Sequence, residues 1–91
     1  MIAKRNRLDV IHDILAAVRD SNNSIRPTPL LRQSNLSSQN FSRYLGELLE
    51  KGFLREVLDR KGRKHYTLTD RGFRYLEQYR NILTFIDDFN L

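Results

Sequence analysis

Residues 51–72 read KGFLREVLDRKGRKHYTLTDRG, and this stretch holds two short apolar runs with a charged turn between them. The runs, 53–58 and 64–68, are of strand length. The turn Asp59-Arg60-Lys61-Gly62-Arg63 has a glycine that can take a positive φ. This pattern predicts a β-hairpin with a basic tip.

A helix is predicted on each side of this hairpin. The upstream helix is expected to run from about Ser38 to Lys51, because a serine at 37 or 38 can cap its start and Gly52 can end it. Its apolar face consists of Phe41, Tyr44, Leu45, Leu48 and Leu49. Downstream, Thr69 can cap a last helix whose apolar spacing supports about 20 residues.

Two more helices are predicted nearer the N-terminus. Apolar residues at helical spacing over 8–18 indicate an amphipathic helix of about 13 residues, with Asn6 as a candidate cap. The segment 25–27 is extended before its proline and is long enough for a very short strand. Thr28-Pro29 predicts an N-cap followed by proline at the first position of a short helix that ends near Ser34.

The predicted order is helix, short strand, helix, helix, hairpin, helix, which is the winged helix-turn-helix arrangement. With Lys51-Gly52-Phe53-Leu54, the basic hairpin tip and Tyr66-x-Leu68-Thr69-x-x-Gly72, the chain resembles the winged-helix domains of small archaeal transcription regulators. From Arg7 to Leu91 it is similar to small archaeal winged-helix chromatin-associated proteins. That resemblance implies a mainly α fold with a small β-hairpin (α+β). It also implies that residues 1–69 form the DNA-binding part and that 70–91 form a dimerisation helix, paired as an antiparallel coiled coil.

Composition and charge narrow the class of protein. The 91 residues carry 16 Lys and Arg against 11 Asp and Glu, a net charge of +5 and a pI near 10.0, which suits a nucleic-acid partner. The absence of cysteine, of a hydrophobic leader and of a long apolar stretch favours a cytoplasmic protein without a membrane span, and binding to DNA would make it nucleoid-associated. His12 and His65 lie far apart in the sequence, and each of the four glycines is isolated. We therefore expect no enzyme activity, cofactor, metal site or small-molecule ligand.

The helix at 38–51 is the candidate reader of DNA bases. Once its apolar face is assigned to the core, the polar side chains that remain suit base or phosphate contacts, because Gln and Asn pair with adenine and Arg pairs with guanine. Arg43 is the best candidate for a base contact, and Glu47 is a weaker one. The alternative is that these are ordinary capping and surface residues. The candidates are Ser38, Gln39, Asn40, Ser42 and Arg43.

Further cations can contact phosphate. The hairpin tip holds four in five positions, and like charges so close repel one another unless an anion lies nearby; the four are Arg60, Lys61, Arg63 and Lys64. A tip of this kind can instead discourage pairing between strand edges, and Asp59 can pair with one of its cations. Arg32 is a candidate phosphate clamp, and Lys4, Arg5 and Arg7 form a candidate basic arm.

The last helix has more apolar surface than one packing face requires. One stripe contains Phe73, Leu76, Leu83 and Ile86, and a second, at alternating spacings of four and three, contains Tyr75, Tyr79, Ile82, Ile86 and Phe89. We expect the second stripe to form a homodimer, although a wide stripe could pack on the first helix of the same chain instead.

The sequence therefore predicts a dimeric protein that binds double-stranded DNA as a transcription regulator or nucleoid-associated protein. The 38–51 helix would enter the major groove, and the 60–64 wing would lie on the backbone or in the minor groove. The alternative is a winged-helix module for protein interaction or assembly that does not bind DNA.

Overall fold

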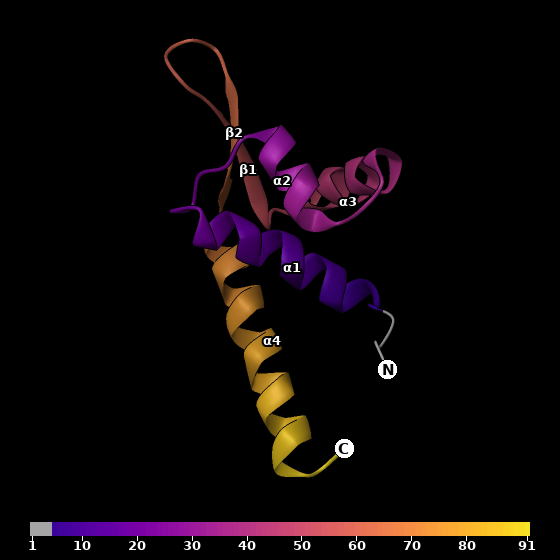
Figure 1. Cartoon of the computed structure of the whole chain (residues 1–91). Coiled ribbons are helices and arrows are strands. Elements are labelled where there is room, and N and C mark those ends of the chain that lie inside the picture. Colours follow the sequence, from indigo (N-terminus) through magenta and orange to yellow (C-terminus); the bar gives the residue numbers. More distant parts are fainter. Residues whose placement is uncertain (1–4) are drawn as a thin grey trace.

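Four helices and one two-stranded hairpin make up the described part of the chain. A computed structural model describes residues 5–91. The elements in chain order are α1 (Arg7–Asp20), α2 (Pro27–Ser34), α3 (Ser38–Glu50), β1 (Leu54–Leu58), β2 (Lys64–Leu68) and α4 (Asp70–Asp88). Figure 1 shows α2, α3 and the hairpin on one side of α1, with α4 extending away on the other side. The predicted fold class, mainly α with a small hairpin and a long last helix, is confirmed.

Three helices begin at side-chain caps that the sequence indicated. The side chain of Asn6 accepts the N–H of Asp9 at 2.9 Å, and the carboxylate of Asp9 accepts the N–H of Asn6 at 3.2 Å, which makes a capping box. Of the two serines that could cap α3, Ser37 is the cap and Ser38 is the first residue of the helix. Thr69 caps α4 as predicted.

The start of α2 differs from the prediction. The helix begins at Pro27, two residues before Pro29, and Arg26 is its N-cap residue without a side-chain cap bond. Thr28 is therefore an exposed residue within the first turn. The reason is that Pro27, with its fixed φ and missing N–H, suits the first helical position as well as Pro29 does.

The hairpin and the loop before α2 form the β part of the fold. Strands β1 and β2 are antiparallel, with Leu54 opposite Leu68 and Leu58 opposite Lys64. Ile25 forms an isolated antiparallel bridge with Tyr66, so the very short strand predicted over 25–27 is reduced to a single bridged residue. It anchors the loop before α2 to the side of β2.

The core is centred on α1 and positions the other elements around it. Ile14, Leu15 and Val18 of α1 are fully buried, as are Leu30 of α2 and Leu48 of α3. The apolar face predicted for α3 packs inward, with Phe41 and Leu48 buried and its other members half-buried against the core. This packing leaves the opposite face of α3 to solvent.

Candidate nucleic-acid interface

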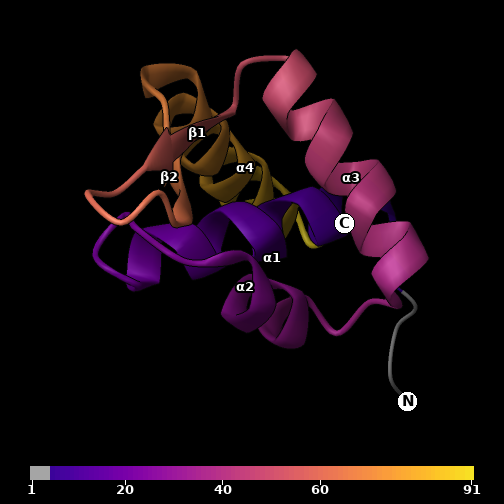
Figure 2. The same ribbon diagram turned by 90° about the horizontal axis from the view of Figure 1, so that it is seen from above.

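The solvent face of α3 carries the predicted base readers. Each of them is exposed, because the burial of Phe41 and Leu48 turns the other side of the helix outward. The exposed set is Ser38, Gln39, Asn40, Ser42 and Arg43. Figure 2 looks down on this side of the molecule and shows α3 and the hairpin at opposite ends of it, with α2 beside them.

Arg43 lies on the flank of α3 that faces the start of α1. Its Nη2 donates to Asn40 Oδ1 at 3.1 Å, so the two side chains are already oriented together. Arg43 lines a shallow hollow with Tyr44, Glu47 and Arg7. Within it, Arg7 forms an ion pair with Glu47, and this hydrogen bond lowers the pKa of the Glu47 carboxyl. Glu47, the weaker candidate for a base contact, thus already has an ion-pair partner within the same chain.

The other flank of α3 faces the hairpin across a second hollow. Ser38 and Ser42 of α3, Thr28 of α2 and Lys64 of β2 all line it. Arg26 joins Thr28 and Lys64 in an adjoining hollow at the start of α2. Hydroxyls, cations and a helix N-terminus together suit a phosphate group.

Sequence reasoning missed Arg26 and Thr28 as members of this surface. The cap role predicted for Thr28 already gives its hydroxyl a partner, so the sequence offers no reason to expect an external contact there. The positive charge of Arg26 was a visible signal, but its distance of 38 positions from Lys64 hid their proximity.

Within residues 5–91, two of the four cations of the hairpin tip form ion pairs, and the other two do not. Arg63 Nε lies 2.8 Å from Asp59 Oδ2, so the pairing suggested for Asp59 is confirmed, and Lys64 Nζ lies 3.1 Å from Glu56 Oε1. Among the described residues, Arg60 and Lys61 have no ion-pair partner. All four are exposed.

The remaining predicted phosphate contacts are placed as follows. Arg32 is exposed in the last turn of α2. Arg5 pairs with Asp13 at 2.9 Å and donates to the carbonyl of Ser34 at 3.0 Å, while Arg7 pairs with α3. Arg5 and Arg7 therefore do not form a free basic arm but tie the start of α1 to neighbouring elements. Lys4 lies outside the described residues.

The predicted dimer stripe of α4 divides into two parts. Tyr75 and Tyr79 contact α1 of the same chain: Tyr75 Oη donates to the carbonyl of Leu8 at 2.8 Å, and Tyr79 donates to Asp9 and stacks on His12 with ring centroids 4.2 Å apart. These two residues therefore pack on the first helix of the same chain, which is the alternative to the dimer contact. The later members, Ile82, Ile86 and Phe89, are exposed.

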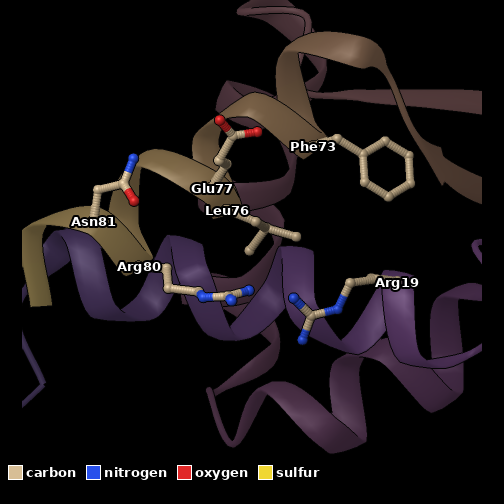
Figure 3. A pocket seen from close by; sticks show the side chains of 6 residues that line it. All are labelled: Arg19, Phe73, Leu76, Glu77, Arg80 and Asn81. Carbon is tan, nitrogen blue, oxygen red and sulfur yellow. The ribbon is translucent and has the colours of Figure 1, made fainter. Parts of the chain in front are cut away.

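A third hollow lies where α1 and α4 meet. Figure 3 shows Arg19 of α1 and Arg80 of α4 extending toward one another beside Leu76, with the ring of Phe73 at one end. Phe73 is 43% exposed, whereas Leu76 is buried. Of the first predicted stripe, only Leu76 is buried in the core, since Phe73, Leu83 and Ile86 are exposed.

Over residues 5–91, no helix combines the length and apolarity that crossing a membrane requires. In the same residues, no group of three or more His, Asp or Glu side chains is arranged to hold a metal ion.

The sequence matches a known family and one curated relative. The family described as winged helix-turn-helix matches residues 4–86. The uncharacterized protein MJ0290 of Methanocaldococcus jannaschii is 32% identical over 83 residues, which are 91% of this chain and 36% of that protein. The chain thus spans little more than a third of the length of this relative.

Two solved structures share the fold. The crystal structure of Sso10a-2, described as a DNA-binding protein from Sulfolobus solfataricus, matches with a TM-score of 0.74 at 19% identity, over 94% of this chain and 86% of that one. F93 from STIV, described as a winged-helix DNA-binding protein, matches with a TM-score of 0.71 at 19% identity, over 88% of this chain and 91% of that one.

Proposed function

Because the chain belongs to the winged helix-turn-helix family, we propose that it binds double-stranded DNA. The observation that carries the proposal is the gathering of exposed polar and cationic groups from α2, α3 and the hairpin on one side of α1, opposite α4. The descriptions of Sso10a-2 and F93 as DNA-binding proteins support it.

In this proposal, α3 enters the major groove and the other elements contact its edges. Gln39, Asn40 and Arg43 reach base edges, where an amide suits adenine and a guanidinium suits guanine. The wing at 60–64 lies on the backbone or in the minor groove, and Lys64 shares a hollow with Ser38 and Ser42 that would take a phosphate. Arg32 at the end of α2 is a further candidate for a backbone contact.

We propose a homodimer as the functional unit, with residues 1–69 for DNA and 70–91 for pairing. The exposed Ile82 and Ile86 lie on the distal half of α4, and the exposed Phe89 is its C-cap residue, so the three follow one another at spacings of four and three, which suits packing against a second copy of the same helix. A two-fold dimer can present its recognition helices to successive major grooves about 34 Å apart.

The proposed role is that of a transcription regulator or a nucleoid-associated protein. Titration by fluorescence anisotropy with a random duplex and with the DNA upstream of its own gene, at about 50 and about 200 mM salt, separates the two. Similar affinity for both duplexes with a steep loss at high salt indicates a general DNA-coating protein. A preference of roughly 10³-fold or more for its own upstream DNA indicates a sequence-specific regulator.

The same titration tests the alternative, a protein-interaction module, which the exposed apolar residues of α4 favour. If the chain binds DNA, changing Arg60, Lys61, Arg63 and Lys64 together to Ala weakens binding strongly and flattens its salt dependence. Absence of binding by the unchanged protein at low salt would overturn the DNA proposal and favour the alternative.

A further inference from the structure

One acidic side chain, Asp59, organises the tip of the wing. Its Oδ1 accepts the backbone N–H groups of Lys61 and Arg63, both at 2.9 Å. Its Oδ2 accepts Arg63 Nε at 2.8 Å and lies 3.2 Å from His65 Nε2. These contacts, led by the backbone N–H of Arg63, hold the pKa of Asp59 far below its usual range. Each of these donors favours the ionised form of the Asp59 carboxyl.

The backbone closes the same loop. The N–H of Asp59 donates to the carbonyl of Arg63 at 2.9 Å, and the N–H of Gly62 donates to the carbonyl of Asp59 at 3.0 Å. Gly62 takes a φ of +76°, which favours glycine. His65 connects this loop to the body of the domain, because its other ring nitrogen lies 3.4 Å from Ser24 Oγ in the loop after α1. The tip is thus built around the Asp59 carboxylate.

This arrangement decides which cations the wing presents. Arg63 is held by Asp59 and Lys64 by Glu56, whereas Arg60 and Lys61 lie between Asp59 and Gly62 with no ion-pair partner in residues 5–91. The loop that displays them is fixed by bonds to Asp59 on both sides of Gly62. A cation displayed on an ordered loop loses less conformational freedom on binding than one on a mobile loop.

We propose that Asp59 is a positioning residue for DNA binding, and that it orders the wing so that Arg60 and Lys61 meet the phosphate backbone. The inference rests on the proposed function. It assigns an acidic residue, which by charge alone would repel DNA, to a role that strengthens binding.

The two views of Asp59 give opposite results for one substitution. By charge alone, Asp59→Ala removes a negative group, frees Arg63 and tightens binding. By positioning, the loop loses its central acceptor, and affinity for a random duplex falls by roughly threefold or more. The matched control is Glu56→Ala, which removes the same charge from the same hairpin and frees Lys64 without touching the loop. It should bind DNA as tightly as the unchanged protein or more tightly.

A rescue and a second readout complete the experiment. Asp59→Asn keeps an oxygen that can accept the Lys61 and Arg63 N–H groups, so it should recover most of the affinity lost in Asp59→Ala. The {1H}-15N heteronuclear NOE of the amides of residues 60–63 should fall in Asp59→Ala and stay near its original value in Asp59→Asn and Glu56→Ala. Tighter binding by Asp59→Ala, or an unchanged NOE, would overturn the inference. If the unchanged protein does not bind DNA, the proposed function fails, and the NOE still reports whether Asp59 orders the loop.

Discussion

Tyr79 is the side chain whose ionisation best reports how α4 attaches to α1. Its hydrogen bond to Asp9, with burial second, raises the pKa of Tyr79 to about 12 from its usual value near 10. The neutral phenol is thus favoured in the folded state, so its contribution to stability is fully present below pH 10 and is lost as the pH rises through about 12.

We therefore predict that the difference in absorbance at about 295 nm between the unchanged protein and Tyr79→Phe titrates near pH 12. Asp9→Asn should move this transition toward the usual value, because it removes the charge that opposes phenolate formation. A transition near pH 10 in the unchanged protein would mean that Tyr79 does not bond to Asp9 in solution.

Two glycines give opposite predictions for substitution by alanine. A Cβ at Gly72 would lie 2.3 Å from the carbonyl oxygen of Phe53, a backbone atom that cannot easily move aside. Gly72→Ala should lower the free energy of unfolding by about 1–3 kcal/mol, as overpacking does. A Cβ at Gly46 would meet nothing within 4 Å, so Gly46→Ala should raise that free energy by about 1 kcal/mol. Urea unfolding of both variants checks the pair, and equal effects would contradict it.

At the scale of the element, Gly46 shares the outward face of α3 with two predicted readers. It lies seven positions after Gln39 and three after Arg43, so the three are neighbours on one face. Packing within the described chain does not explain the glycine. If α3 approaches DNA closely there, Gly46→Ala should weaken DNA binding roughly threefold or more even though it stabilises the fold. Unchanged affinity in the anisotropy titration would place Gly46 outside the contact.

The wing as an element should show unequal cations. Changing Arg60 and Lys61 together to Ala should reduce the slope of log affinity against log salt by roughly 1.8, as expected for the loss of two phosphate contacts. Changing Arg63 and Lys64 together should reduce it less, because both are already paired within the hairpin. Both double variants lose the same net charge, so equal slopes would show that the ion pairs open when DNA binds.

The sequence predicted where helices and strands form, because local signals decide that. It did not predict which of these elements contact one another. The caps Asn6 and Thr69 and the glycine after α3 are local signals, and the structure contains all three. The predicted start of α2 was wrong because Pro27 and Pro29 both suit the first position of a helix, and local sequence does not choose between them. The ion pair between Arg7 and Glu47 spans 40 positions, and no periodicity in the sequence reveals a contact of that kind.

For the same reason, the candidate site could be predicted only in part. The exposed face of α3 follows from helical spacing, since burial of one face exposes the other. The pairing of Lys64 with Glu56 depends on the hairpin register, and the hollow shared by Thr28, Ser42 and Lys64 depends on tertiary packing. Single-residue chemistry could nominate Ser42 and Lys64 but not Thr28, and it could not place the three side chains together.

At the scale of the whole molecule, the two proposed activities lie on opposite sides of α1. The α3 and wing surface faces one way, and α4 extends the other way within a shape of 50 × 27 × 21 Å. In the first half of α4, Leu76, Tyr75 and Tyr79 pack on α1 and Phe73 stays partly exposed. Most of the apolar surface that a second copy could cover therefore lies on the distal half. Loss of that pairing should therefore leave the folded DNA-binding part intact.

We predict that Ile82→Asp with Ile86→Asp converts a dimer into a monomer in sedimentation equilibrium, because two carboxylates in a paired apolar stripe would be buried without partners. The control is Thr84→Asp, two positions from each isoleucine and so on the opposite face of the helix, where an added charge stays in solvent.

The double variant should keep its circular dichroism spectrum and bind DNA more weakly, because each monomer then engages a single site without the effective concentration that a linked second site supplies. A monomeric unchanged protein would refute the dimer directly. A double variant that remains dimeric would move the contact from the distal stripe of α4 to another surface.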